Sequence, residues 1–135
     1  MEIQDIKMLS KTIITTENLA NEFKELFNSP EAKNAKGVVY FFMSEISIPR
    51  VHGKSNILYI GKTIQTIQTI NKRYFKYSEH LANAKNGIFY KHIIENYGGL
   101  KMGYVITKTP RETENIFFNK YHQTYLEFPP KSKVG

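Results

Sequence analysis

The chain has 135 residues, the usual length of one domain. A chain of this length can bury a hydrophobic core without disulfides or a structural metal ion. It contains no cysteine, so disulfides and thiolate chemistry are excluded, and we find no pattern typical of a signal segment or a membrane span. Lysine and arginine number 19 against 12 acidic residues, and residues 61–101 alone hold seven basic and two acidic side chains. Such a local surplus suits a phosphate-rich partner, and a solvated lysine face gives the same pattern. We expect a soluble, cytoplasmic protein without a membrane partner.

Two segments precede the first predicted strand. Residues 16–28 predict a helix with Thr16 as its N-cap, and Pro30 ends the segment. Its apolar face consists of Leu19, Phe23, Leu26 and Phe27. Residues 29–36 have the composition of a linker. We therefore predict an N-terminal helical extension over residues 1–36 and a main domain over residues 37–135.

Two strands and a long helix come next. The β-branched and aromatic residues of 37–42 and 57–60 predict two strands, which most simply pair as an antiparallel hairpin. Residues 44–56 contain Pro and Gly and predict an irregular connection between them. From Thr63 onward, apolar residues at spacings of three and four predict an amphipathic helix. Its apolar residues are Ile64, Ile67, Ile70, Tyr74, Tyr77 and Leu81.

The last part of the chain predicts a helix, a strand and a helix. The first helix covers residues 88–97 and ends at a Gly-Gly pair, and residues 100–107 form a third strand. Gly103 weakens that strand or marks the close approach of another backbone. Thr109, Pro110 and Glu112 predict the N-cap, first residue and capping box of the last helix. The predicted fold class is α+β, with a small three-stranded antiparallel or mixed sheet flanked by helices.

The stretch Gly61-Lys62-Thr63 follows an apolar strand, as in the phosphate-binding loops of nucleotide-binding proteins. Such a loop needs another glycine five residues before Gly61, because its backbone amides must curl around the phosphate. Asn56 occupies that position. The stretch is therefore better explained as a strand end that presents Tyr59.

The order of the motifs resembles the GIY-YIG nuclease family. The resemblance rests on Gly37-Val38-Val39-Tyr40, on Leu58-Tyr59-Ile60-Gly61-Lys62, on Arg73 in a helix, and on a glutamate in the helix after the third strand. It implies an endonuclease that hydrolyses DNA phosphodiesters with one divalent metal ion, in a restriction, mobile-element or repair role. A homodimer is expected if the enzyme cuts both strands. The alternative is a DNA-binding module that kept the fold and lost catalysis.

The resemblance also implies roles for the residues of the two strands. Tyr59 is the general base or its immediate partner, Lys62 lowers the pKa of Tyr59, and Gly61 lets the substrate approach. The family spacing of glycine, one residue, tyrosine would place Val39 in the site, and Tyr40 comes one residue later. Neighbouring strand residues face opposite sides, so only one of the two can face the site. We favour Tyr40.

The predicted helix after Thr63 supplies the phosphate-binding residues. Arg73 and Tyr77 are four apart and share one flank, and the planar guanidinium of arginine suits the scissile phosphate. His80 competes with Tyr77 for its place. With Gly61, we assign Lys72, Lys76 and His80 to substrate binding.

The carboxylate of the site is Glu112 or Glu114. Glu112 is explained by the capping box, whereas Glu114 shares a helical face with Phe117 and Tyr121 and so points inward. An inward carboxylate needs a partner, which is a metal ion such as Mg²⁺ or Mn²⁺, or a basic side chain. We choose Glu114 as the metal ligand. The asparagine that many family members carry after a C-terminal proline is absent, since Pro130 is followed by Lys-Ser-Lys-Val-Gly.

Overall fold

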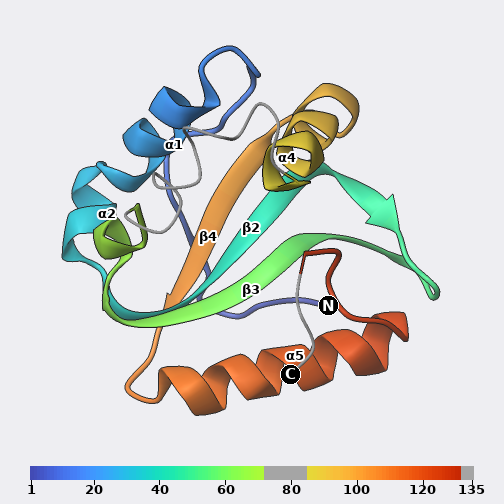
Figure 1. Cartoon of the computed structure of the whole chain (residues 1–135). Coiled ribbons are helices and arrows are strands. Elements are labelled where there is room, and N and C mark those ends of the chain that lie inside the picture. Colours follow the sequence, from blue (N-terminus) through green and yellow to red (C-terminus); the bar gives the residue numbers. More distant parts are fainter. Residues whose placement is uncertain (72–84, 132–135) are drawn as a thin grey trace.

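A four-stranded sheet between two helical layers forms the protein (Figure 1), in a computed structural model that describes residues 1–71 and 85–131. The strand order is β1-β4-β2-β3 and every pairing is antiparallel. The strands are β1 (Lys7–Met8), β2 (Lys36–Pro49), β3 (Lys54–Thr66) and β4 (Leu100–Ile106). The helices are α1 (Leu19–Phe27), α2 (Pro30–Asn34), the 3₁₀ helix η1 (Ile67–Ile70), α4 (Lys85–Asn96) and α5 (Pro110–Tyr125). The predicted α+β class is confirmed, with four strands in place of the predicted three.

The extra strand comes from the N-terminal segment. Lys7 and Met8 pair with Tyr104 and Gly103 of β4. A Cβ atom on Gly103 would lie 2.7 Å from Ile6 Cδ1 and 2.9 Å from Met8 Sδ, so this glycine makes room for two side chains rather than for the predicted approach of another backbone. Residues of the segment 1–36 also lie in the core beneath α1. The boundary after residue 36 stays a prediction, although both sides of it share one core.

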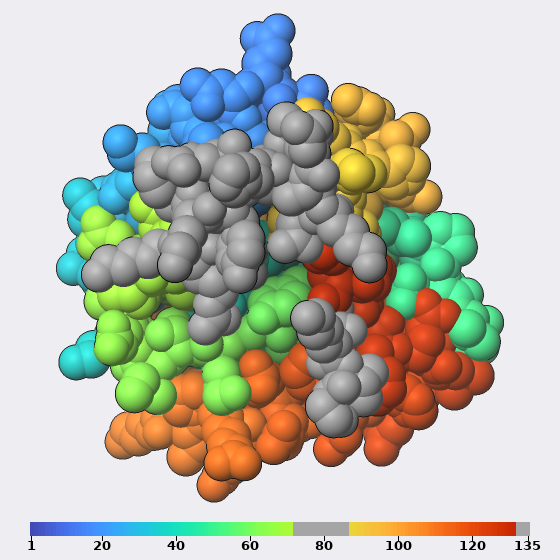
Figure 2. Space-filling model, in the orientation of Figure 1, coloured from blue at the N-terminus to red at the C-terminus, as the bar shows by residue number. Residues whose placement is uncertain are grey.

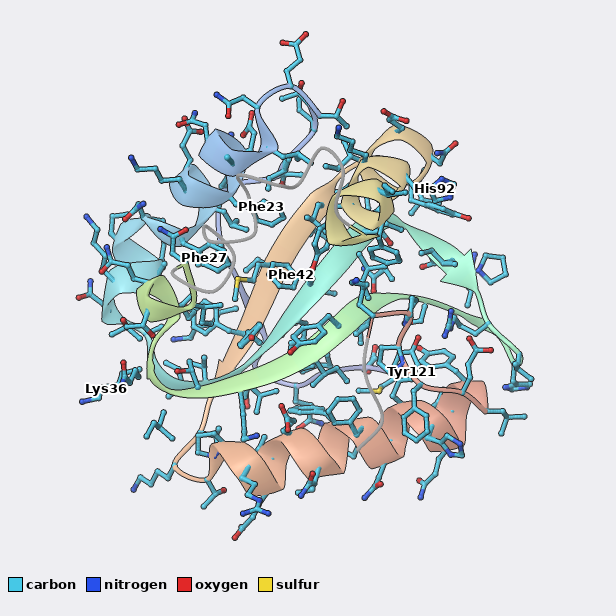
Figure 3. The ribbon with its side chains drawn as sticks, viewed as in Figure 1. Phe23, Phe27, Lys36, Phe42, His92 and Tyr121 are labelled. Carbon is cyan, nitrogen blue, oxygen red and sulfur yellow. The ribbon has the colours of Figure 1, made fainter. Side chains whose placement is uncertain are left out.

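The two faces of the sheet carry two apolar clusters, because strand side chains alternate. Tyr40 and Phe42 of β2 face the layer formed by α1, α2 and α4. Phe23 and Phe27 of α1 lie in this cluster (Figure 3). Val39, Phe41 and Ile60 face α5, where the fully buried Tyr121 lies (Figure 3). The four predicted apolar residues of α1 are all buried, as expected.

The connection between β2 and β3 corrects a prediction. Residues 44–49 belong to β2 and residues 54–56 to β3, with a register shift between Met43 and Ile48. Ile48 pairs with Ser55 and Pro49 with Lys54, and the N–H of Arg50 donates to the carbonyl of Gly53 over 2.9 Å. Pro49 stands at the end of β2, where a missing N–H is tolerated, and Gly53 adopts a φ of +73° in the turn. Proline and glycine therefore shape the tip of one long hairpin.

A β-bulge in β3 sets which side chains face which layer. Phe42 pairs with Tyr59 and Met43 with Ile57, so Leu58 is an extra residue without a partner position on β2. Leu58 and Tyr59 consequently both lie on the side of the first apolar cluster.

At the starts of three helices, the structure differs from the predicted hydrogen bonding or helix boundary. The N-cap of α1 is Asn18 rather than Thr16. The predicted linker 29–36 contains α2, whose first turn is capped by Ser29 Oγ accepting from the N–H of Ala32 over 3.2 Å. The capping box of α5 does not form, because the N–H of Thr109 donates to Thr107 Oγ1 over 3.1 Å.

The helix predicted after Thr63 begins later than expected. β3 continues to Thr66, with Ile64 74% exposed, and η1 follows with Ile67 and Ile70 buried. The position of Ile64 matches both the two-residue spacing of a strand and the spacing of three and four residues of a helix. Its side chain is exposed to solvent because β3 is the edge strand of the sheet. The rest of the predicted helix lies outside the described residues. The predicted helix over 88–97 and strand over 100–107 are confirmed as α4 and β4.

The C-terminal segment folds back over the sheet edge. Leu126 turns the chain at a φ of +60°, and the N–H of Lys131 donates to the carbonyl of Leu58 over 2.9 Å. The ammonium of Lys131 lies 5.2 Å from the ring centre of Phe89 on α4. Residues 126–131 thus connect the end of α5 to the outer edge of β3. Across 1–71 and 85–131, no helix has the length and apolar character needed to cross a membrane.

Candidate active site

A groove of about 620 Å³ lies between the outer edge of β3 and the first turn of α5. Figure 2 shows the two segments side by side, β3 in green and α5 in orange. The groove is lined by Tyr59, Lys62, Thr63, Ile64 and Gln65 of β3 and by Thr109, Pro110, Arg111, Glu112 and Glu114. It exists because β3 is an edge strand, so side chains from both of its faces reach the same opening.

The rings of two tyrosines, one of which lines the groove, contact each other beside a glycine. Tyr40 pairs with Gly61 across the hairpin, and its ring centre lies 5.9 Å from that of Tyr59. A Cβ atom on Gly61 would lie 2.4 Å from Tyr40 Cζ and 2.7 Å from Tyr59 Cε1. Only glycine leaves room for both rings. Gly61 therefore sets the packing of the two tyrosines.

This packing answers which residue of the first motif shares a side with Tyr59. Tyr40 lies on the same face of the sheet as Tyr59, whereas Val39 is buried against α5. Tyr40 is fully buried, while Tyr59 is half-buried and lines the groove. Tyr59 is thus the tyrosine of this pair that lines the groove, and Tyr40 packs against its ring.

Lys62 and Glu114 meet on the opposite face of β3. Lys62 pairs with Val39, so its side chain points toward α5. Its Nζ lies 3.3 Å from Glu114 Oε1, with side chains 42% and 16% exposed. The side chain of Glu114 is partly buried, as expected from its place on the inner face of α5, and a partly buried carboxylate favours a positive partner. Glu112 is exposed.

The donor set of the groove is small. Within residues 1–71 and 85–131, no three His, Asp or Glu side chains lie close enough together to hold a metal ion by themselves. Glu114 alone offers a carboxylate that is both partly shielded and open to the groove. A hard cation that retains waters and takes further oxygens from a substrate fits one such carboxylate, provided that Lys62 moves away from it.

The structure brings together four of the six predicted catalytic residues, which are Tyr40, Tyr59, Lys62 and Glu114. Gly61 lies among them. The other predicted site residues, Lys72, Arg73, Lys76, Tyr77 and His80, lie outside the described residues.

Arg111 is a groove residue that our sequence analysis missed. It lies in the first turn of α5, is exposed, and lines the groove with Glu114. Residues three apart on a helix share a face, so its spacing from Glu114 was the available signal.

No protein-family model matches the chain, and no curated protein matches it. One solved structure similar to it is that of the restriction endonuclease HPY188I in complex with product DNA. The two sequences are 12% identical, the likeness covers 96% of this chain and 81% of the other, and the TM-score is 0.37.

Proposed function

We propose that the protein is a divalent-metal-dependent DNA endonuclease of the GIY-YIG type. The observation that carries this proposal is that Tyr59, Lys62 and Glu114 line one groove. Lys62 and Glu114 are 52 positions apart in the sequence, and the fold brings them into contact. Phosphodiester hydrolysis requires a proton acceptor for the attacking water and positive charge near the phosphate, and a carboxylate can hold a divalent cation that supplies such charge.

Each of these side chains has a role in the proposed reaction. Tyr59, as its phenolate, accepts a proton from the attacking water, directly or through a relay, and returns to the neutral phenol. The buried ring of Tyr40 fixes the position of the Tyr59 ring. Lys62 is within reach of the groove and neutralises charge on the phosphate once it leaves Glu114. Glu114 would hold Mg²⁺ or Mn²⁺, and the ion supplies charge stabilisation when bound.

Residues outside the described ranges complete the proposed site. Arg73 binds the scissile phosphate through its planar guanidinium, and Tyr77 joins the hydrogen-bond network. Lys72, Lys76 and His80 contact neighbouring parts of the DNA. These roles rest on the sequence resemblance.

The test is a cleavage assay on supercoiled plasmid and on single-stranded DNA, with Mg²⁺, with Mn²⁺ and with EDTA. We expect metal-dependent cutting that falls by about 10²–10⁴-fold in Tyr59→Phe, because a positioned proton acceptor contributes that much. Glu114→Gln should lose metal-dependent cutting. Tyr97→Phe and Glu95→Gln, which change the same residue types outside the groove, should cut like the wild type. Full activity of Tyr59→Phe or Glu114→Gln would refute the assigned role.

A second candidate function is a DNA-binding module without catalysis. The contact between Lys62 and Glu114 favours it, because the one shielded carboxylate of the groove already has a positive partner. Such a module binds DNA in a salt-dependent way and shows no metal-dependent cutting. Whether the proposed nuclease acts as a homodimer is a separate question. A homodimer should cut both strands and give linear plasmid rather than nicked plasmid, and the mass of the protein in solution should be that of two chains.

A further inference from the structure

The groove extends beyond Tyr59, Lys62 and Glu114 to a second part, which we call the outer groove. It is lined by Ile64, Gln65, Arg111 and Glu112 among others. Among the residues that the structure describes, two cations line the groove. Lys62 contacts Glu114, whereas Arg111 makes no ion pair with any residue of the described ranges. The side chain of Arg111 is exposed. Arg111 therefore brings a positive charge to the outer groove that Glu114 does not neutralise.

The position of Arg111 relates it to the proposed catalytic groups. Arg111 and Glu114 are three residues apart on α5, so their side chains share a face and are separated by a rise of about 4.5 Å along the helix. Successive phosphates of one DNA strand rise by about 3.4 Å along the duplex axis. If the strand runs along α5 with one phosphate at Glu114 and Lys62, its neighbouring phosphate lies within reach of Arg111.

We propose that Arg111 is a substrate-binding residue that holds the phosphate next to the one at the catalytic groups. The inference rests on the proposed nucleic-acid substrate and extends the site by one nucleotide. The guanidinium can donate two parallel hydrogen bonds to non-bridging oxygens, which a lone exposed lysine cannot.

Glu112 has the opposite effect in the same place. It also lines the outer groove, is exposed, and follows Arg111 directly in the chain. Its carboxylate repels the phosphate that Arg111 attracts. Neutralising the two residues one at a time should therefore change DNA affinity in opposite directions.

The experiment measures binding of a labelled 20-base-pair duplex by fluorescence anisotropy at several salt concentrations. EDTA is present throughout, so that the DNA stays intact. The variants are Arg111→Gln, Glu112→Gln and, as a matched control, Lys108→Gln, which removes an exposed charge three positions from Arg111 that does not line the groove. We expect Arg111→Gln to weaken binding about tenfold and to lower the salt slope by about 0.9, the value of one phosphate contact. Glu112→Gln should tighten binding, and Lys108→Gln should change it less than threefold.

Binding by Arg111→Gln within twofold of the wild type, or equal to Lys108→Gln, would overturn the inference, as would a wild type that does not bind the duplex. Cleavage with Mg²⁺ is measured separately. If the wild type cuts DNA and Arg111→Gln binds the duplex as tightly as the wild type, the inference about Arg111 is wrong and the proposed function is supported. Binding that depends on Arg111 without any cutting removes the nuclease and leaves the inference standing.

Discussion

The two ends of the pair formed by β3 and α5 are built in opposite ways. At the hairpin tip, backbone and side-chain contacts close the space between the strands and the end of the helix. Arg50 pairs with Glu127 and donates to the carbonyl of Phe128 over 2.6 Å, and the N–H of His52 donates to the carbonyl of Tyr125 over 3.1 Å. At the other end, one contact of 3.3 Å between Lys62 and Glu114 spans an open groove.

The tyrosines of the two ends differ in the same way. Tyr121, near the closed end, has no exposed surface, and burial raises the pKa of its hydroxyl. It stays protonated and serves the core. Tyr59, at the open end, is half-buried and lines the groove. The comparison teaches that one strand and one helix are tied together by several contacts at one end and leave polar side chains accessible at the other.

Breaking the closed end should cost the most stability. Arg50→Met removes the partner of Glu127 and the donor to the Phe128 carbonyl from a side chain that is only 11% exposed. We expect a loss of about 2–3 kcal/mol in the free energy of unfolding, since hydrogen bonds to charged groups contribute that much and the groups left behind are partly buried. Urea denaturation measures it. Lys54→Met, an exposed change on the same tip, should stay within about 0.5 kcal/mol of the wild type. Equal stability of the two variants would show that the tip is not an anchor.

Gly61→Ala should have an intermediate effect, at the base of the open end. The new Cβ atom would lie under 3 Å from both Tyr40 and Tyr59, so the rings must shift. We expect a loss of about 1–3 kcal/mol, the usual cost of overpacking, together with a changed tyrosine signal in near-ultraviolet circular dichroism. Ile64→Ala, at an exposed position of the same strand, is the stability control. An unchanged melting temperature and spectrum would mean that the rings are not fixed by the glycine.

Lys62→Met should have the smallest effect on stability. The pair with Glu114 is partly exposed, so its loss should cost about 0.5–1 kcal/mol at low salt. The difference from the wild type should shrink at 1 M NaCl, where charges are screened beyond about 3 Å. Urea denaturation at 0.05 M and 1 M NaCl checks this, with Lys120→Met on the exposed side of α5 as a control. If Lys62→Met lost more than about 2 kcal/mol of unfolding free energy at both salt concentrations, the contact of Lys62 with Glu114 would not be the weak, partly exposed ion pair described above.

Much of the fold could be predicted because its signals are local. The apolar spacing of α1, the glycine pair after α4 and the Thr-Pro start of α5 each depend on a few neighbouring residues. The inward position of Glu114 followed from the helical period of Phe117 and Tyr121 in the same way.

The rest depends on contacts between distant segments. β1 could not be predicted, because Lys7 and Met8 form a strand only through β4. The length of β3 was missed because Ile64 matches both periods, and only the pairing with β2 decides between them. The contact of Lys62 with Glu114 joins two elements whose distance no local pattern encodes. Thr109 is the N-cap of α5 as predicted, and only the capping box failed, because Thr107, just after β4, accepts the N–H of Thr109 that Glu112 was expected to bind.

The bond between the N–H of Lys131 and the carbonyl of Leu58 has a consequence for how the chain behaves at high concentration. An edge strand with free backbone groups is a template for adding another chain and so for polymer growth. The C-terminal segment occupies one of these positions on β3. Another strand that docks at Leu58 must first displace residues of this molecule's own C-terminal segment, so this segment opposes edge-to-edge pairing at that position of β3.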